Sequence, residues 1–141
     1  MQPEWLEEAE DWLAIADLDL LSAQRLMDGD PTLTGNATYH AQQAAEKALK
    51  AYIVARGRAL PRTHALIVLL SECEEEDESF SSLRSQAIAL NPYATRFRYP
   101  LVGDLLQPED AEAIEAIEYA AAIVTTTRER IASLPVPTDD A

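Results

Sequence analysis

The sequence YHAQQAAEKALKA, residues 39–51, decides the fold of this chain. Small and apolar residues recur along it at spacings of three and four, which is typical of one buried face of an α-helix. The helix predicted around this stretch runs from Ala37 to Ala55 and ends at Gly57. Its expected inner face is made of Ala41, Ala44, Ala45, Ala48, Leu49 and Tyr52. Because most of these side chains are small, a neighbouring helix can approach closely.

Four further helices are predicted on either side of this stretch. The first runs from Pro3 to Met27 and ends at the turn Asp28-Gly29-Asp30-Pro31, and its two tryptophans, Trp5 and Trp12, indicate packing in a core or a dimer. The others cover residues 65–76, 80–90 and 108–134. Thr63 is the expected N-cap of the helix over residues 65–76. The last helix is expected to bury one face, made of Ile114, Ile117, Ala121, Val124 and Ile131.

The composition supports a single all-α domain. The chain has 141 residues, of which 48% are apolar and only 4 are glycine, so it can bury a core but lacks the turn residues of an all-β protein. The order of elements predicts an up-and-down bundle of four or five helices. We expect residues 1–134 to form the bundle and residues 135–141 to form a short polar tail.

Several classes of protein are disfavoured by the sequence. No stretch approaches 18 apolar residues, and the N-terminus has no basic region, so neither a membrane span nor a secretory signal is expected. The single cysteine, Cys73, cannot form an internal disulfide, and together with the helical composition this favours a cytoplasmic protein. Cys73 lies on an apolar helix face and is expected to be buried. With two histidines and one buried cysteine, no metal site is expected, and the motifs that bind common cofactors are absent.

The charge is unevenly distributed along a chain whose formal net charge is −14. No acidic residue lies between Lys47 and Ser71 or between Ser79 and Gly103, and these two spans hold 8 of the 11 basic residues. One interpretation is that these basic islands are what remains between solvated acidic helix faces. The other is that they form a focused site for an anion, with the acidic remainder discouraging unspecific binding of nucleic acid.

Four motifs in order resemble those of a known family, the HEPN domain (higher eukaryotes and prokaryotes nucleotide-binding domain). They are a tryptophan-led first helix with Ala16-Asp17-Leu18, the stretch from Tyr39 to Ala51, the sequence PRTHAL at residues 61–66, and Arg98-Tyr99-Pro100 before the last helix. The resemblance covers about residues 4–133. It implies a helical bundle that forms a homodimer and that is commonly encoded beside a minimal nucleotidyltransferase, as in toxin–antitoxin pairs.

The resemblance also bears on activity. Many members are metal-independent ribonucleases that use an arginine followed four to six residues later by a histidine, placed near the start of a late helix. An arginine can hold the scissile phosphate, and a histidine can move the proton of the attacking hydroxyl group. In this sequence no histidine follows Arg98, and the residue at the expected spacing is Asp104. A literal match exists only as Arg58 and His64, in the loop after the helix that ends at Ala55.

Three functional hypotheses remain. The first is a non-catalytic helical partner of a minimal nucleotidyltransferase that binds nucleotide or RNA phosphate at a basic cleft. The second is a ribonuclease toxin that uses Arg98 or Arg96 with His64, and the third is an adaptor for oligomerisation. The missing histidine favours the first over the second, and the basic islands favour both over the third. The candidate phosphate-binding residues are Lys47, Lys50, His64, Arg96, Arg98 and Tyr99.

Overall fold

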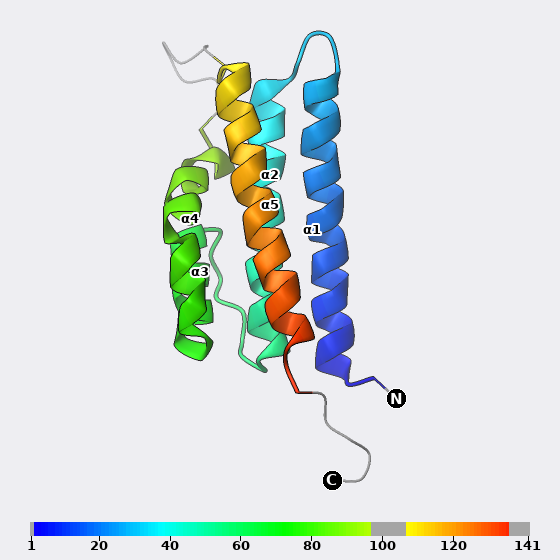
Figure 1. The fold of residues 1–141 in the computed structure, drawn as a ribbon, viewed down its shortest axis with the longest axis vertical. Coiled ribbons are helices and arrows are strands. Elements are labelled where there is room, and N and C mark those ends of the chain that lie inside the picture. Colours follow the sequence, from blue (N-terminus) through cyan, green and yellow to red (C-terminus); the bar gives the residue numbers. More distant parts are fainter. Residues whose placement is uncertain (1, 97–106, 136–141) are drawn as a thin grey trace.

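The protein is a bundle of helices. A computed structural model describes residues 2–96 and 107–135, and within these residues every regular element is a helix (Figure 1). The prediction of an all-α bundle is therefore confirmed. Five α-helices and two short 3₁₀ helices are described, in the order α1 (Glu4–Asp28), α2 (Thr34–Ala55), α3 (Leu66–Glu76), η1 (Glu78–Leu83), α4 (Arg84–Leu90), η2 (Asn91–Ala94) and α5 (Asp110–Ala132).

The connection between α2 and α3 turns back along the bundle. It rises from the end of α2, so that α3 begins beside the middle of α2, where Gln42 Nε2 donates a hydrogen bond to the carbonyl oxygen of His64 at 3.3 Å (Figure 1). At the other end of α3, Glu76 pairs with Arg56, the residue after α2, at 3.0 Å. Helices α2 and α3 therefore run in the same direction. This places the segment before α3 against the side of α2.

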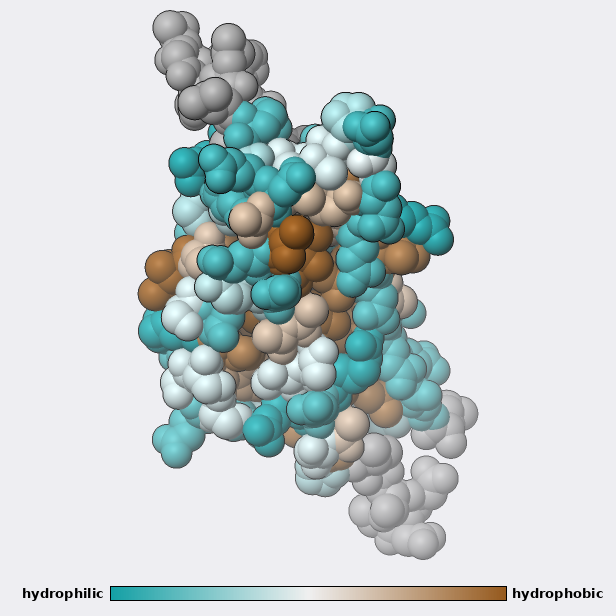
Figure 2. Space-filling view, turned by 45° about the horizontal axis from the view of Figure 1, so that its top comes forward, coloured by the Kyte–Doolittle hydropathy of each residue, from teal (hydrophilic) through white to brown (hydrophobic). Residues whose placement is uncertain are grey.

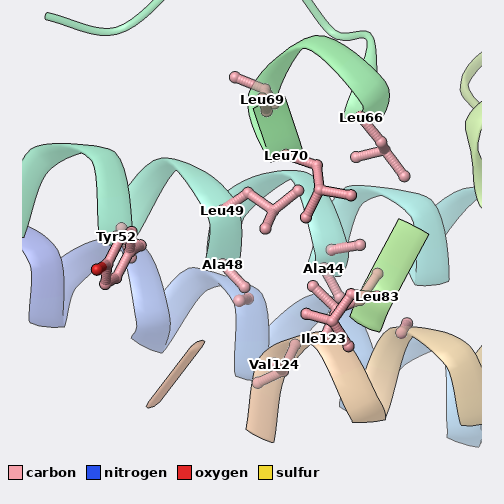
Figure 3. Packing of buried hydrophobic residues seen from close by; sticks show 14 of the residues in the cluster. Ala44, Ala48, Leu49, Tyr52, Leu66, Leu69, Leu70, Leu83, Ile123 and Val124 are labelled. Atoms are coloured by element: carbon pink, nitrogen blue, oxygen red, sulfur yellow. The ribbon is translucent and has the colours of Figure 1, made fainter. Parts of the chain in front are cut away.

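The core is built around α2. All six residues predicted for its inner face are buried, and α1, α3 and α5 pack against the helix from different sides. Figure 3 shows Leu66, Leu69 and Leu70 of α3 on the side of Leu49, whereas Ile123 and Val124 of α5 lie near Ala44 and Ala48. Cys73 is fully buried in the same cluster, as expected, and burial raises the pKa of its thiol.

The buried face of α5 differs from the prediction. Val124 and Ile131 are buried, but Ile114 is 49% exposed, and the inner face also contains Ala113, Ala116, Ala120, Ile123 and Thr127. Along α5, isoleucines and alanines form two neighbouring faces, offset from each other by about one residue in sequence. The alanine face is turned inward because α2 also presents alanines, and two rows of small side chains allow the helix axes to approach closely.

Helix ends depend on distant residues as well as local ones. Thr63 Oγ1 accepts a hydrogen bond from the backbone N–H of Ala65 at 3.0 Å, just before α3. The first backbone N–H of the helix, that of Leu66, instead donates to Oδ1 of Asn91 at 2.7 Å. The predicted helix over residues 80–90 begins as the 3₁₀ helix η1. The carboxylate of Asp77 caps η1 by accepting from the backbone N–H of Ser79 at 3.0 Å.

The described surface carries separate hydrophobic groups among hydrophilic side chains, on the face that Figure 2 presents. Among the large apolar side chains that are exposed, three lie on α1: Ile15, Leu18 and Leu21. None of the described helices combines the length and the apolar character that a membrane crossing requires.

Candidate functional site

Polar side chains follow one flank of α2, where it meets α1. His40, Gln43, Lys47 and Lys50 are separated by three, four and three residues, so they lie along one stripe of the helix. Asp19 of α1 faces the upper part of this stripe, and Glu46 and His64 complete the lower part. We call these seven residues the α2 polar cluster.

In the upper part of the cluster, Asp19 binds two residues of α2. Its Oδ1 atom lies 2.9 Å from Nδ1 of His40, and its Oδ2 atom accepts a hydrogen bond from Nζ of Lys47 at 3.3 Å. The same Nζ atom donates to Oε1 of Gln43 at 2.9 Å. An ammonium group has three donors, so Lys47 retains one for a further acceptor.

In the lower part, the carboxylate of Glu46 lies between two partners. Nζ of Lys50 donates to Oε2 at 3.2 Å, and Nδ1 of His64 lies 3.1 Å from Oε1. Lys50 also lies over the ring of Trp12, with Nζ 5.4 Å from the centroid. A cation over an indole face is held by electrostatic attraction, so the position of the Lys50 ammonium group is fixed by two helices.

Glu46 is buried, which the sequence did not predict. Taken alone, its pairing with Lys50 at a spacing of four is typical of a surface helix, but the residue is only 1% exposed. The returning segment before α3 covers it, and His64 and Lys50 satisfy its oxygens. A signal was present in the sequence, because Leu49 and Ile53, three and seven residues after Glu46, place apolar side chains on the same side of the helix.

One side of the His64 ring is bound to a buried residue, and the rest of the ring is exposed to solvent. Its side chain is 77% exposed, although its Nδ1 atom is bound to the buried carboxylate. A carboxylate can only accept hydrogen bonds, so Nδ1 carries the hydrogen in this contact. Nε2 is then an acceptor on the neutral ring and a donor on the protonated ring. A fixed, exposed imidazole of this kind can bind an anion or exchange a proton.

Three arginines of the basic islands are paired with acidic residues of α3. The guanidinium group of Arg58 lies within 3.2 Å of carboxylate oxygens of Glu72, Glu75 and Glu76. Two further arginines, Arg56 and Arg84, pair with Glu76 and Glu74. These arginines therefore stabilise the packing of α3 more than they attract an anion.

The literal arginine–histidine match is not assembled in the fold. Arg58 binds residues at the end of α3, whereas His64 lies just before its start. The two side chains therefore lie at opposite ends of an 11-residue helix. The contacts described for Arg58 and His64 support no shared active site.

The predicted site residues that precede α5 are only partly described by the structure. Arg98 and Tyr99 are outside the described residues, and so is Asp104. Arg96 is exposed just after η2, and its backbone N–H donates to the carbonyl oxygen of Pro92 at 3.0 Å. Tyr93 anchors η2 to α5 by donating to Oε1 of Glu112 at 2.5 Å; burial and this hydrogen bond raise the pKa of the Tyr93 hydroxyl.

The structure thus brings together part of the predicted site. Lys50 and His64 meet through Glu46, and Lys47 lies on the same stripe of α2. Asp19, Gln43 and Glu46 were not predicted as site residues. Two lysines and two carboxylates give this cluster no net charge when its histidines are neutral. Within the described part of the chain, no group of three or more histidine, cysteine and acidic residues is placed to hold a metal ion.

Comparison with known proteins gives one consistent family. The sequence matches the HEPN domain over residues 9–130. The structure is similar to that of TT1696 from Thermus thermophilus, with a TM-score of 0.77 and 33% identity over 87% of this chain and 98% of the other. It is also similar to ST0689, an archaeal HEPN homologue, with a TM-score of 0.72 and 25% identity over 88% of this chain and 98% of the other. No curated protein matches the sequence significantly.

Proposed function

The chain belongs to the HEPN domain family, and we propose that it is the helical partner of a minimal nucleotidyltransferase and binds the phosphate of a nucleotide or RNA at the α2 polar cluster. The observation that carries the proposal is the contact between exposed His64 and buried Glu46. The buried carboxylate of Glu46 fixes the ring of His64, most of which lies outside the core, and so it orients a group that can bind a ligand.

The cluster has free donors for a phosphate. Lys50 uses one of its three hydrogens on Glu46, and Lys47 uses two on Asp19 and Gln43. His64 adds a donor at Nε2 when its ring is protonated. The carboxylates hold these groups in place, so little side-chain entropy is lost when an anion binds. Because the net charge of the chain is −14, binding must depend on local contacts.

The binding experiment uses a fluorescent single-stranded RNA and compares His64→Ala with Arg128→Ala. Because the His64 side chain is 77% exposed, water can take its place at the carboxylate of Glu46, and its loss should leave the fold intact. Arg128 is exposed as well and pairs only with Asp17 among the ion pairs of the described residues. We expect His64→Ala to weaken binding about fivefold or more, with Arg128→Ala close to wild type, and we expect affinity to fall with added salt. Equal effects of the two substitutions would contradict the proposal.

The partnership is tested by co-expression with the reading frame next to the gene. A short nucleotidyltransferase encoded there should co-purify with this protein. An isolated gene, or a neighbour that does not co-purify, would remove the support for a two-component system and leave phosphate binding to be judged alone.

One alternative has its own observation. A histidine whose Nδ1 is bound to a buried carboxylate has the arrangement of a general base, which a metal-independent ribonuclease requires. The contacts described for His64 are with Glu46 and Gln42, and the sequence has no histidine after Arg98, so we rank ribonuclease activity below binding.

A homodimer is proposed as well. Trp5 and Trp12 are partly buried and pack against the core. The exposed side chains Ile15, Leu18 and Leu21 on α1 support a dimer, since three neighbouring apolar residues on one helix are a candidate contact between copies. The non-catalytic adaptor hypothesis rests on the same surface.

A further inference from the structure

The ring of His64 is held so that one of its two nitrogens remains free to react. Its Nδ1 atom lies 3.1 Å from Oε1 and 3.2 Å from Oε2 of Glu46. Because the Nδ1 hydrogen is used on this carboxylate, the neutral ring carries its lone pair at Nε2. Among the described residues, no hydrogen bond or ion pair of the ring uses Nε2, and 77% of the side chain is exposed. Nε2 is therefore an accessible nucleophile of fixed orientation.

The backbone of His64 is held as well as its ring. Gln42, which is fully buried, donates from Nε2 to the carbonyl oxygen of His64 at 3.3 Å. Gln43 in turn donates to Oε1 of Gln42 at 2.7 Å, so the amide of Gln42 is itself fixed. A nucleophile that is positioned before the reaction loses little further freedom in the transition state. The buried side of α2 thus orients both the main chain and the side chain of one exposed histidine.

Positive groups lie close to His64 in the fold and in the sequence. Nζ of Lys50 donates to the same carboxylate that holds the ring, at 3.2 Å, and retains two of its three hydrogens. Arg62, two residues before His64, is exposed, and in the part of the chain that the structure describes no ion pair or hydrogen bond uses its guanidinium group. Such groups attract an anionic reagent and stabilise the negative charge of a phosphoryl group.

The other histidine of the chain has only part of this arrangement. Nδ1 of His40 lies 2.9 Å from Oδ1 of Asp19, so this ring is oriented by a carboxylate as well. Its side chain is only 34% exposed, and its ring lies edge-on to that of Tyr39, with centroids 5.5 Å apart. His40 is therefore an internal comparison for the reactivity of His64.

We propose that Nε2 of His64 is a phosphoryl acceptor, which is modified covalently by a phosphoramidate. This class of compound has a phosphorus–nitrogen bond and includes the phosphohistidine of another protein. The transfer exchanges one phosphorus–nitrogen bond for another, so it needs no further source of energy. The inference goes beyond the proposed function, which gives His64 only a reversible contact with phosphate.

The transfer balances with the groups present. The lone pair of Nε2 attacks phosphorus and forms the new bond, while the bond between phosphorus and the donor nitrogen breaks. The donor nitrogen leaves with the electron pair of that bond, as ammonia when the donor is phosphoramidate itself. The positive charge that develops on the imidazole ring is stabilised by the carboxylate of Glu46, which keeps the Nδ1 hydrogen in place. Glu46 is a positioning residue, and His64 is the residue that reacts.

The experiment incubates the purified chain with potassium phosphoramidate. Intact mass follows the reaction, fragmentation assigns the phosphoryl group to His40 or His64, and ³¹P NMR distinguishes the Nε2 from the Nδ1 isomer. We expect one phosphoryl group, at Nε2 of His64, added about tenfold faster than to N-acetylhistidine in solution and faster than to His40.

Three variants test the arrangement around the ring. Glu46→Gln should slow the transfer and should yield a mixture of isomers, because an amide can accept from or donate to Nδ1 and leaves the ring free to turn over. A structural role alone would not change the isomer. Arg62→Ala should slow the transfer, whereas Arg25→Ala, at another exposed arginine in the last turn of α1, should not. If Glu46→Gln fails to fold by circular dichroism, the two arginine variants decide.

Two results would overturn the proposal. One is a His64 that reacts no faster than N-acetylhistidine or no faster than His40. The other is a transfer that proceeds alike in Arg62→Ala and Arg25→Ala, with the Nε2 isomer alone in Glu46→Gln, because His64 would then react as any exposed imidazole does. Binding of RNA by the unmodified protein is measured separately, so either result leaves the proposed function to its own test.

Discussion

The Nδ1 atom of His64 lies 3.1 Å from Oε1 of Glu46, in a contact between a side chain that is 77% exposed and one that is almost fully buried. The two residues are 18 apart in sequence, one on α2 and one in the segment that returns beside it. The segment that returns beside α2 therefore supplies the exposed histidine of the candidate site and covers Glu46. Each of the following predictions tests a part of this arrangement or of the bundle that supports it.

Removing the carboxylate of Glu46 should destabilise the protein. Glu46→Ala leaves the ammonium group of Lys50 without its partner in a position that is only 13% exposed, so we expect the free energy of unfolding to fall by about 3 kcal/mol. Urea denaturation measures the change. Glu118→Ala, at an exposed position of α5, is the control and should change stability by about 0.5 kcal/mol or less. Equal effects would show that the buried contact is not needed for folding.

The N-terminus of α3 should depend on Asn91, which is 25 residues away from Leu66 in sequence. Asn91→Ala removes the acceptor for the first backbone N–H of the helix, and the loss of such a cap costs about 1 kcal/mol. Thermal unfolding should show the melting temperature lowered by about 3 °C. Asn91→Asp keeps an acceptor oxygen and should restore most of the stability. A full loss in both variants would indicate a packing role instead.

The stability of the protein should depend on pH through Asp77. The hydrogen bonds that Ser79 donates to its carboxylate hold the pKa of Asp77 below its ordinary value, and Arg130 and Arg56 add to this effect. A carboxylate with a lowered pKa in the folded state stabilises that state above the pKa of the unfolded chain, about 3.9, and loses this contribution as the pH falls through the folded value. Wild type should therefore exceed Asp77→Asn in free energy of unfolding at pH 6. The difference should disappear as the pH is lowered from about 4, and a difference that stays constant would exclude this role.

Dimerisation should require the exposed residues of α1. Light scattering at micromolar concentration should give about twice the chain mass of 15.6 kDa. Leu18→Glu places a charge on the most exposed of the three apolar side chains and should yield a monomer. Ile88→Glu, on the exposed side of α4, is the matched control and should leave the dimer intact. A wild-type protein that is strictly monomeric would contradict the prediction.

The isolated protein should show little or no ribonuclease activity in EDTA. Proton transfer near neutral pH needs a histidine beside an arginine that holds the phosphate, and the sequence has no histidine after Arg98. Purified protein is incubated with total RNA, alongside His64→Ala and Arg98→Ala variants. Cleavage by wild type that is lost in both variants would reverse the ranking of binding over catalysis.

The sequence was sufficient to predict the order of the α-helices and the inner face of α2, although the segment predicted as one helix over residues 80–90 begins as the 3₁₀ helix η1. Alanine and leucine at spacings of three and four define a helix whatever its neighbours are, because the pattern depends on the local period of the backbone. All six residues predicted for that face, from Ala41 to Tyr52, are buried. The family could also be predicted, since three of its four motifs lie within or directly before the helices α1, α2 and α3, whose periodicity is local; the fourth, Arg98-Tyr99-Pro100, is outside the described residues.

Only the tertiary structure decided which face of α5 is buried and where charges are compensated. Ile114 is more hydrophobic than Ala113, yet Ala113 faces the core because close contact between helices favours the smaller side chain. Arg58 belongs to a basic stretch of sequence, but α3 brings Glu72, Glu75 and Glu76 to it. Glu46 has the spacing of a surface residue and is buried because the segment before α3 returns beside α2. Burial and ion pairing depend on contacts between residues that are distant in sequence, and local periodicity contains no information about those contacts.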